Sequence, residues 1–193
     1  MTSSITGWIV ALFRDVTPVE AIRDEIFESI GQPSIYTCEW LPHLSFFGTA
    51  VPEQEVDSFT KRLADTAAPL IRKSFEVKGF HVYPDPMNPM VIGLDPAVRI
   101  TPCRSRVREL LIQHDGTVTD GPHPPHVTLF RAGDDADEST WGPLPNQVHH
   151  RLRQELFQRE STHTLTIDSI RLLRTEEYRA ARKMRKHSLV GSE

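Results

Sequence analysis

Two six-residue segments of the chain are close copies of each other: Pro42–Phe47 reads PHLSFF and Pro125–Phe130 reads PHVTLF. Each has the order proline, histidine, aliphatic residue, hydroxyl residue, apolar residue, phenylalanine. Aliphatic and aromatic residues in this density are typical of strands, and alternate side chains of a strand share one face. Each copy is therefore predicted to be a strand that presents its histidine and its hydroxyl on the same side. The sequence thus offers one imidazole and one hydroxyl, twice.

The two copies belong to a longer repeat. Four features recur in the same order at nearly constant spacing. They are the histidine (His43 and His126), a Thr-Pro pair (Thr17-Pro18 and Thr101-Pro102), a glycine (Gly31 and Gly116) and an apolar strand (Trp8–Phe13 and Met90–Leu94). Ordered recurrence of this kind predicts a duplicated unit, although the period is longer than that of common solenoid repeats.

The apolar and capping patterns predict the same order of elements in each half, β-α-β-α-β. In the first half, strands are expected at 7–13, 42–48 and 74–82, with helices over 17–31 and from Glu53. The second of these helices is expected to turn an apolar stripe inward, with Val56, Phe59, Leu63 and Leu70. In the second half, strands are expected at 90–94, 125–132 and 164–173, with helices that begin at Thr101-Pro102 and that carry Val148, Leu152 and Leu156. Thr17 and Thr101 are predicted as helix caps, each followed by proline at the first helical position. The fold class is therefore α+β, with duplicated halves that form two lobes around a central groove.

The expected domain organisation is a single two-lobed domain over residues 1–193. Its halves cover about 7–82 and 90–173, and the proline-rich stretch 83–89 joins them. Residues 174–193 form a basic tail, interpreted as a solvated helix end or frayed terminus, with an RNA-backbone contact as the alternative.

The bulk composition narrows the class of protein. The formal net charge of −4 does not suggest a wholesale nucleic-acid or membrane binder. Cys38 and Cys103 form no metal-type or redox-type pair, which favours a reducing compartment. From the N-terminal residues we expect no leader segment, and no apolar run approaches membrane-spanning length. We therefore expect a monomeric cytoplasmic protein that does not bind membranes.

Nine histidines are present, and most lack a patterned partner. His43 and His126 differ because each has the same neighbours at the same place in a repeat. His123 and His126 could in principle bind a metal ion together. However, the prolines between them force an extended chain, and no set of carboxylates or thiols completes a zinc site. The chain also lacks a G-x-S-x-G elbow and a P-loop. We expect no metal and no other cofactor.

At these residues the chain resembles the two-histidine phosphoesterase superfamily, in particular its LigT-like, 2′-5′ RNA ligase branch. The family hallmark is a pair of His-x-Ser/Thr-x motifs, one in each half of a duplicated fold. Here they are His43-Leu44-Ser45-Phe46 and His126-Val127-Thr128-Leu129. The resemblance runs from Gly7 to about Leu173 through the order of strands and helices.

The resemblance implies a metal-independent enzyme that hydrolyses ribose 2′,3′-cyclic phosphates on RNA ends or small nucleotides. His43 and His126 would be the catalytic acid and base, and Ser45 and Thr128 would bind the phosphate. Arg131 would help to hold phosphate or nucleotide, because members of this branch often carry an arginine there; strict alternation along the strand would point it away from His126. The alternatives are a 2′-5′ RNA ligase or 2′-5′ phosphodiesterase, a hydrolase of cyclic nucleotide or dinucleotide signals, and a non-catalytic module that binds RNA ends.

Overall fold

Strands and helices make up most of the part of the chain that the computed structural model describes, namely residues 3–30, 36–39, 41–82, 90–95, 97–120, 124–132, 163–181 and 184–186. The strands are β1 (Ser4–Phe13), β2 (Tyr36–Glu39), β3 (His43–Pro52), β4 (Ser74–Val82), β5 (Met90–Asp95), β6 (Thr117–Asp120), β7 (His126–Ala132), β8 (Thr164–Arg174) and β9 (Met184–Lys186). They form one curled sheet in the order β6-β3-β1-β8-β4-β5-β7-β2-β9. Every pairing is antiparallel, and an additional contact between β3 and β7 closes the sheet on itself.

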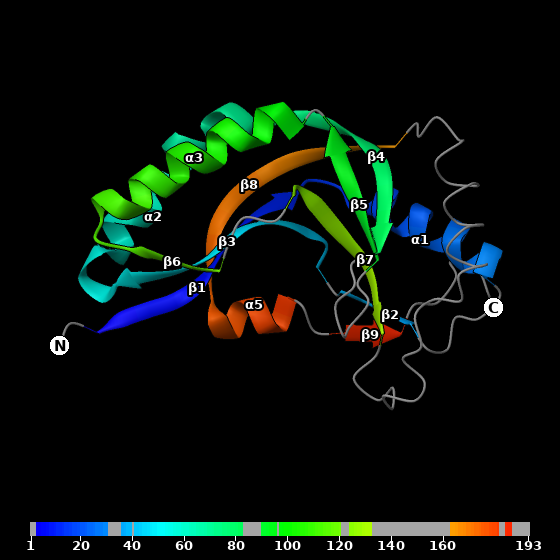
Figure 1. Cartoon of the computed structure of the whole chain (residues 1–193), viewed down its shortest axis with the longest axis horizontal. Helices are drawn as coiled ribbons and strands as arrows, with labels where there is room; N and C mark the ends of the chain where they lie inside the picture. Colours follow the sequence, from blue (N-terminus) through cyan, green and yellow to red (C-terminus); the bar gives the residue numbers. More distant parts are fainter. Residues whose placement is uncertain are drawn as a thin grey trace.

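Helices cover both faces of this sheet. They are α1 (Thr17–Ile30), α2 (Val56–Ala67), α3 (Ala97–Gln113) and α5 (Thr175–Ala181), with the 3-10 turns η2 (Glu53–Glu55) and η3 (Ala68–Leu70) at the ends of α2. Figure 1 shows α2 and α3 side by side over one face of β1, β3 and β8, and α5 beneath the other face. Helix α1 lies at the opposite end of the sheet, against β7. The α+β class predicted from the sequence is confirmed.

Strand pairing crosses the boundary between the two halves of the sequence. The last long strand, β8, pairs with β1 from Gly7 opposite Arg174 to Phe13 opposite Ile167. Strand β4 of the first half pairs in turn with β5 of the second. Each part of the sheet is therefore built from residues of both halves.

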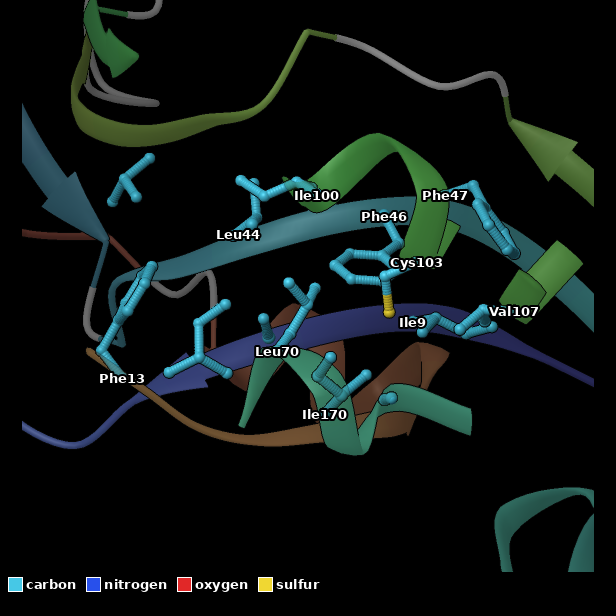
Figure 2. Packing of buried hydrophobic residues seen from close by; sticks show 14 of the residues in the cluster. Ile9, Phe13, Leu44, Phe46, Phe47, Leu70, Ile100, Cys103, Val107 and Ile170 are labelled. Atoms are coloured by element: carbon cyan, nitrogen blue, oxygen red, sulfur yellow. The ribbon is translucent and has the colours of Figure 1, made fainter. Parts of the chain in front are cut away.

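The hydrophobic core lies between the curled sheet and helices α2 and α3. Figure 2 shows side chains from β1, β3 and α3 meeting there, among them Ile9, Phe46 and Cys103. Phe59 and Leu63 of α2 and Leu70 of η3 are also buried, as the predicted apolar stripe requires. Burial of a large apolar side chain contributes about 1.5–3 kcal/mol, so this cluster holds β1 and β3 against the helices.

Two helix starts differ from the predictions. Helix α3 begins at Ala97, so Thr101-Pro102 lies inside it rather than at its cap. The buried Ile100 explains this, because it extends the apolar stripe of Cys103 and Val107 by one turn toward the N-terminus.

In α1 the first turn is capped by Asp15, two residues before the predicted cap. Thr17 is already helical, and its N–H donates to the Asp15 carboxylate at 2.9 Å. A carboxylate at this position accepts a backbone donor that the helix leaves without an internal partner.

Part of the predicted basic tail forms regular structure where the structure describes it. Residues 175–181 form α5, which packs on β1 and β8 and buries Tyr178 and Ala181. Residues 184–186 form β9, which pairs with β2. The predicted linker over 83–89 and the helix with Val148, Leu152 and Leu156 lie outside the described residues. Of the helices within the described ranges, none has the length and apolar character needed to span a membrane.

Candidate active site

The two motif strands are neighbours in the sheet. β3 and β7 meet in an antiparallel pair that sets Leu44 opposite Val127. Both side chains have no exposed surface and point into the hydrophobic core. Because side chains alternate along a strand, the residues that flank Leu44 and Val127 point to the other face of the sheet.

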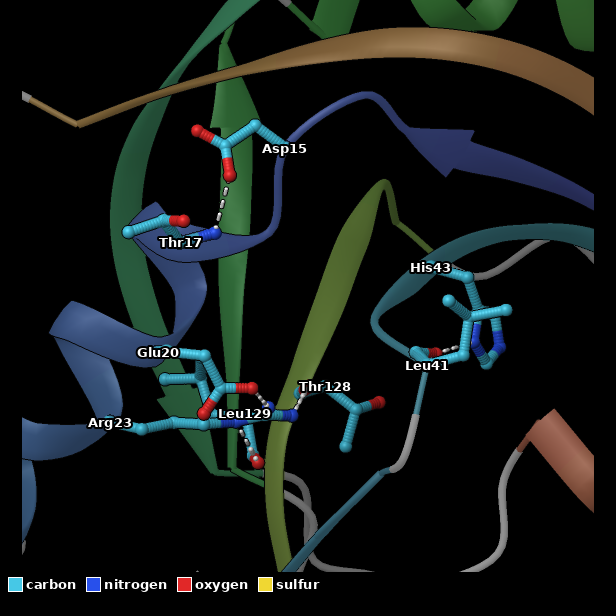
Figure 3. Close-up of polar contacts among 8 residues, drawn as sticks. All are labelled: Asp15, Thr17, Glu20, Arg23, Leu41, His43, Thr128 and Leu129. Carbon is cyan, nitrogen blue, oxygen red and sulfur yellow. Dashed lines mark hydrogen bonds and ion pairs between the residues drawn. The ribbon is translucent and has the colours of Figure 1, made fainter. Parts of the chain in front are cut away.

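This register brings together the four motif residues that were predicted to act on a phosphate. Continued by one residue on each side of this pair, the antiparallel register would set His43 opposite Thr128 and Ser45 opposite His126. Side chains directly opposite each other share a face and lie about 4.5–5.5 Å apart at Cβ. Figure 3 shows the Thr128 side chain projecting from β7 toward the segment of β3 that carries His43. The strands therefore adjoin each other directly, where the sequence had suggested that they face each other across a groove.

Both histidine rings are held in the same way. His43 Nδ1 lies 2.9 Å from the Leu41 carbonyl oxygen, and His126 Nδ1 lies 2.8 Å from the Pro124 carbonyl oxygen. A carbonyl oxygen can only accept, so Nδ1 carries the hydrogen in both rings. The hydrogen bond fixes the tautomer and leaves Nε2 as the nitrogen that exchanges a proton with a substrate. In each copy the acceptor carbonyl belongs to the residue two positions before the histidine, so the hydrogen bond that orients the ring is also repeated.

Each motif has one buried and one half-buried residue in its pair of histidine and hydroxyl. His43 is 5 % exposed and Thr128 is 5 % exposed, whereas Ser45 and His126 are half-buried. The site therefore has one side that is screened by protein and one that is open to a ligand.

Tyr178 of α5 is a site residue that the sequence did not indicate. Its hydroxyl oxygen lies 3.3 Å from Ser45 Oγ, and its ring meets the His43 ring edge-on at a centroid distance of 5.4 Å. The other side of the ring stacks on Trp8 of β1 at 4.7 Å. Tyr178 is 7 % exposed, so these contacts fix it firmly beside the first motif. Its only signal in the sequence was an aromatic residue within a basic segment.

Arg131 lies in the same strand as the second motif, three residues after Thr128. Its backbone is opposite Thr37 of β2, and its side chain lies outside what the structure describes. The prediction that it points away from His126 assumed strict alternation. That assumption fails, because the register of β7 against β5 shifts between Thr128 and Phe130.

Within the described ranges, no group of three or more histidine, cysteine, aspartate or glutamate side chains is placed to hold a metal ion. The chemistry of the four motif side chains is proton transfer and hydrogen bonding.

Two His-x-Ser/Thr motifs on adjacent strands of a duplicated α+β fold define a two-histidine phosphoesterase. A family model described as the 2'-5' RNA ligase superfamily matches residues 11–179, and the chain belongs to that superfamily. Among solved structures, the chain is similar to Usb1 of Kluyveromyces marxianus, with a TM-score of 0.46 and 14% sequence identity over 88% of this chain and 97% of that chain. No curated protein matches the sequence.

Proposed function

We propose that the protein is a metal-independent phosphodiesterase that opens ribose 2′,3′-cyclic phosphates, on RNA ends or on small nucleotides, by two-histidine acid–base catalysis. The observation that carries this proposal is the matched support of the two rings: His43 and His126 each donate from Nδ1 to a backbone carbonyl. Two imidazoles that each turn Nδ1 toward a backbone carbonyl, on adjacent strands, are suited to flank one phosphorus atom.

In the proposed mechanism one imidazole, neutral at Nε2, removes a proton from the attacking water. The other imidazole, protonated at Nε2, gives a proton to the departing ribose oxygen. Each positioned proton transfer is worth roughly 10²–10⁴ in rate. Because the two rings make the same hydrogen bond, the pH profiles of the single variants would assign which histidine is the base and which is the acid.

Ser45 and Thr128 would donate hydrogen bonds to the non-bridging oxygens of the phosphate. Charge on these oxygens must be accommodated in the transition state, and donors fixed in advance are the effective way to do so. Because Leu44 is opposite Val127, the continued register would bring Thr128 beside His43 and Ser45 beside His126. Each histidine would thus be paired with a hydroxyl from the other copy of the motif.

The test is a panel of substrates with product identification. We expect faster turnover of 2′,3′-cyclic AMP than of 3′,5′-cyclic AMP or a 2′-5′-linked dinucleotide, with a 2′-phosphate as product. The strained five-membered ring needs less distortion than the other two phosphodiesters. Faster turnover of 3′,5′-cyclic AMP would refute the substrate assignment.

The same panel carries a test of the two histidines. His43→Ala and His126→Ala should each abolish most turnover, and their losses should not add, because both residues act on one reaction. His163→Ala is the matched control, since His163 lies at the start of β8 beside Glu25 and outside the motifs. Wild-type turnover by either motif variant would reject the acid–base assignment.

Synthesis or cleavage of a 2′-5′ linkage is the second candidate, favoured by the superfamily to which the chain belongs. The same base and acid serve both directions of one in-line displacement, so the site residues do not separate them. An RNA with a 2′,3′-cyclic phosphate end and a second RNA with a 5′-hydroxyl end, incubated together, would reveal joining. Tight binding of such ends without turnover would instead favour a recognition module.

A further inference from the structure

Both motif strands carry a β-bulge, and it falls at the same place in the two copies. Along β1 and β3, Ile9 is opposite Phe47, while the next residue, Val10, is opposite Ser45. Phe46 is therefore an extra residue on β3. A bulge of this kind bends the strand and changes the direction of the side chains beside it.

The second motif repeats this geometry against a different partner strand. Along β5 and β7, Met90 is opposite Phe130 and Val91 is opposite Thr128, which leaves Leu129 as the extra residue. Phe46 and Leu129 each follow the motif hydroxyl directly. Each bulge is thus placed to set the direction of the hydroxyl that precedes it.

A buried arginine contacts the bulge of the second motif. Arg23 of α1 has no exposed surface. Its Nε donates to the Leu129 carbonyl oxygen at 2.9 Å and its Nη2 to the Thr128 carbonyl oxygen at 3.4 Å (Figure 3). Its Nη1 donates to the Glu20 carboxylate at 2.7 Å, which neutralises the buried charge. The fork of one guanidinium therefore holds both carbonyls of the bulge.

A second buried arginine contacts the bulge of the first motif. Arg104 of α3 is 8 % exposed, and its Nη2 donates to the Ser45 carbonyl oxygen. Its guanidinium carbon lies 5.5 Å from the centroid of the Phe46 ring, which is the extra residue of that bulge. Burial lowers the pKa of Arg104 to about 10, so the side chain still carries its charge at neutral pH.

The two contacts are crossed between the halves of the chain. Arg23 comes from the first half and holds the Thr128 carbonyl, whereas Arg104 comes from the second half and holds the Ser45 carbonyl. The ladder between β3 and β7 consists of one residue pair in the described part of these strands, so the carbonyls around it need donors from outside the sheet.

We propose that Arg23 and Arg104 are positioning residues that fix the two bulges and so aim the Thr128 and Ser45 hydroxyls at the phosphate. This inference rests on the proposed phosphodiesterase function. Each guanidinium fixes the peptide plane of the residue that bears the hydroxyl, and therefore the direction of its Cα–Cβ bond. If the two arginines only stabilised the sheet, their substitution would lower the stability of the fold by the same amount whether or not the Ser45 or Thr128 hydroxyl is present.

The test is a pair of crossed double-mutant cycles on 2′,3′-cyclic AMP hydrolysis. Arg104→Lys should lower kcat about tenfold, the scale of one lost hydrogen bond to a charged group, with little change in KM. Combined with Ser45→Ala it should cost almost nothing further, because the hydroxyl that it aims is gone. Combined with Thr128→Ala the two losses should multiply. Arg23→Lys should show the reverse pattern.

Several controls keep the result interpretable. Arg62→Lys is the matched arginine control, because Arg62 of α2 contacts Gln113 and His114 and neither motif strand. Thermal melting of every variant reports whether the sheet survives. If a lysine variant does not fold, Glu20→Gln (which leaves Arg23 in place) and Phe46→Leu (which leaves Arg104 in place) carry the same crossed predictions at smaller amplitude.

The outcomes separate this inference from the proposed function. An active wild type whose arginine variants show unchanged kcat, or couple equally to both hydroxyls, overturns the positioning role alone. A wild type without turnover overturns the proposed hydrolysis, and the crossed cycles are then measured on the binding of 2′-AMP. Absence of both turnover and 2′-AMP binding overturns both.

Discussion

The hydroxyl of Tyr178 offers the sharpest single-atom test of the site. Tyr178→Phe removes one oxygen and keeps the ring that stacks on Trp8 at 4.7 Å and meets His43 at 5.4 Å. The lost contact is the 3.3 Å approach to Ser45 Oγ. When the Tyr178 hydroxyl donates to Ser45 Oγ, the Ser45 proton is directed toward the substrate instead. We therefore expect the variant to fold normally and to turn over more slowly.

The magnitude follows from the length of that contact. A neutral hydrogen bond contributes about 0.5–1.5 kcal/mol, which corresponds to roughly 2–12-fold in rate, and the long distance of 3.3 Å favours the lower half of the range. Tyr178→Ala should behave differently, because Tyr178 is only 7 % exposed and removal of its ring would leave a cavity at a buried position. Loss of a buried aromatic side chain costs about 3–5 kcal/mol of folding stability.

The assay is kcat and KM on 2′,3′-cyclic AMP, with thermal melting alongside. We expect Tyr178→Phe to lower kcat a few-fold at nearly unchanged KM and melting temperature, and Tyr178→Ala to lower the melting temperature strongly. In a Ser45→Ala background the phenylalanine substitution should have no effect on kcat. Unchanged kcat in the single variant, or the same decrease with and without the Ser45 hydroxyl, would refute the reasoning.

Three further predictions concern metal, pH and thiol chemistry. Exhaustive chelation of metal ions should leave turnover unchanged. Loss of turnover that zinc or manganese restores would indicate a metal-dependent phosphodiesterase instead. Hydrogen bonds from the Thr17 side chain and backbone N–H hold the pKa of the Asp15 carboxyl below its usual range. The ionised carboxylate therefore stabilises the folded protein at pH values above its usual pKa, and this stabilisation is lost as pH falls through the lowered pKa. The gap in melting temperature between wild type and Asp15→Asn, which cannot titrate, should therefore shift against the wild type as pH falls below about 4, and a constant gap would contradict this. Burial raises the pKa of the Cys103 thiol to about 11, so peptide mapping should find it unalkylated by iodoacetamide at neutral pH until the chain unfolds; fast labelling of the folded protein would show that α3 opens.

The sequence predicted the motif strands because their pattern is local. Proline, histidine and hydroxyl recur at fixed spacing, and alternation alone places His43 with Ser45 on one face. The predicted helix stripes at Phe59 and Leu63 hold for the same reason, since both are buried along α2. These features follow from the periodicity of a single strand or helix.

The remaining site residues depend on contacts that no local pattern encodes. Tyr178 reaches Ser45 only because β8 pairs with β1 and carries α5 to the site. Arg23 and Arg104 contact bulges, and a bulge interrupts the very alternation from which strand faces are predicted. The sequence therefore indicated the motif histidines and hydroxyls, but it did not indicate Tyr178, Arg23 and Arg104, which contact the motif residues.

The pairing of the first strand with the last long strand also governs when the site can exist during synthesis. On the ribosome, β1 emerges early, but its partner β8 and the Tyr178 that packs on Trp8 emerge only after nearly everything else. A nascent chain, or one that is truncated before β8, keeps one edge of β1 unpaired and lacks part of the wall beside His43. Such pairing between distant strands slows folding and exposes open edges until it is complete. Formation of the candidate site is thus tied to synthesis of β8 and α5.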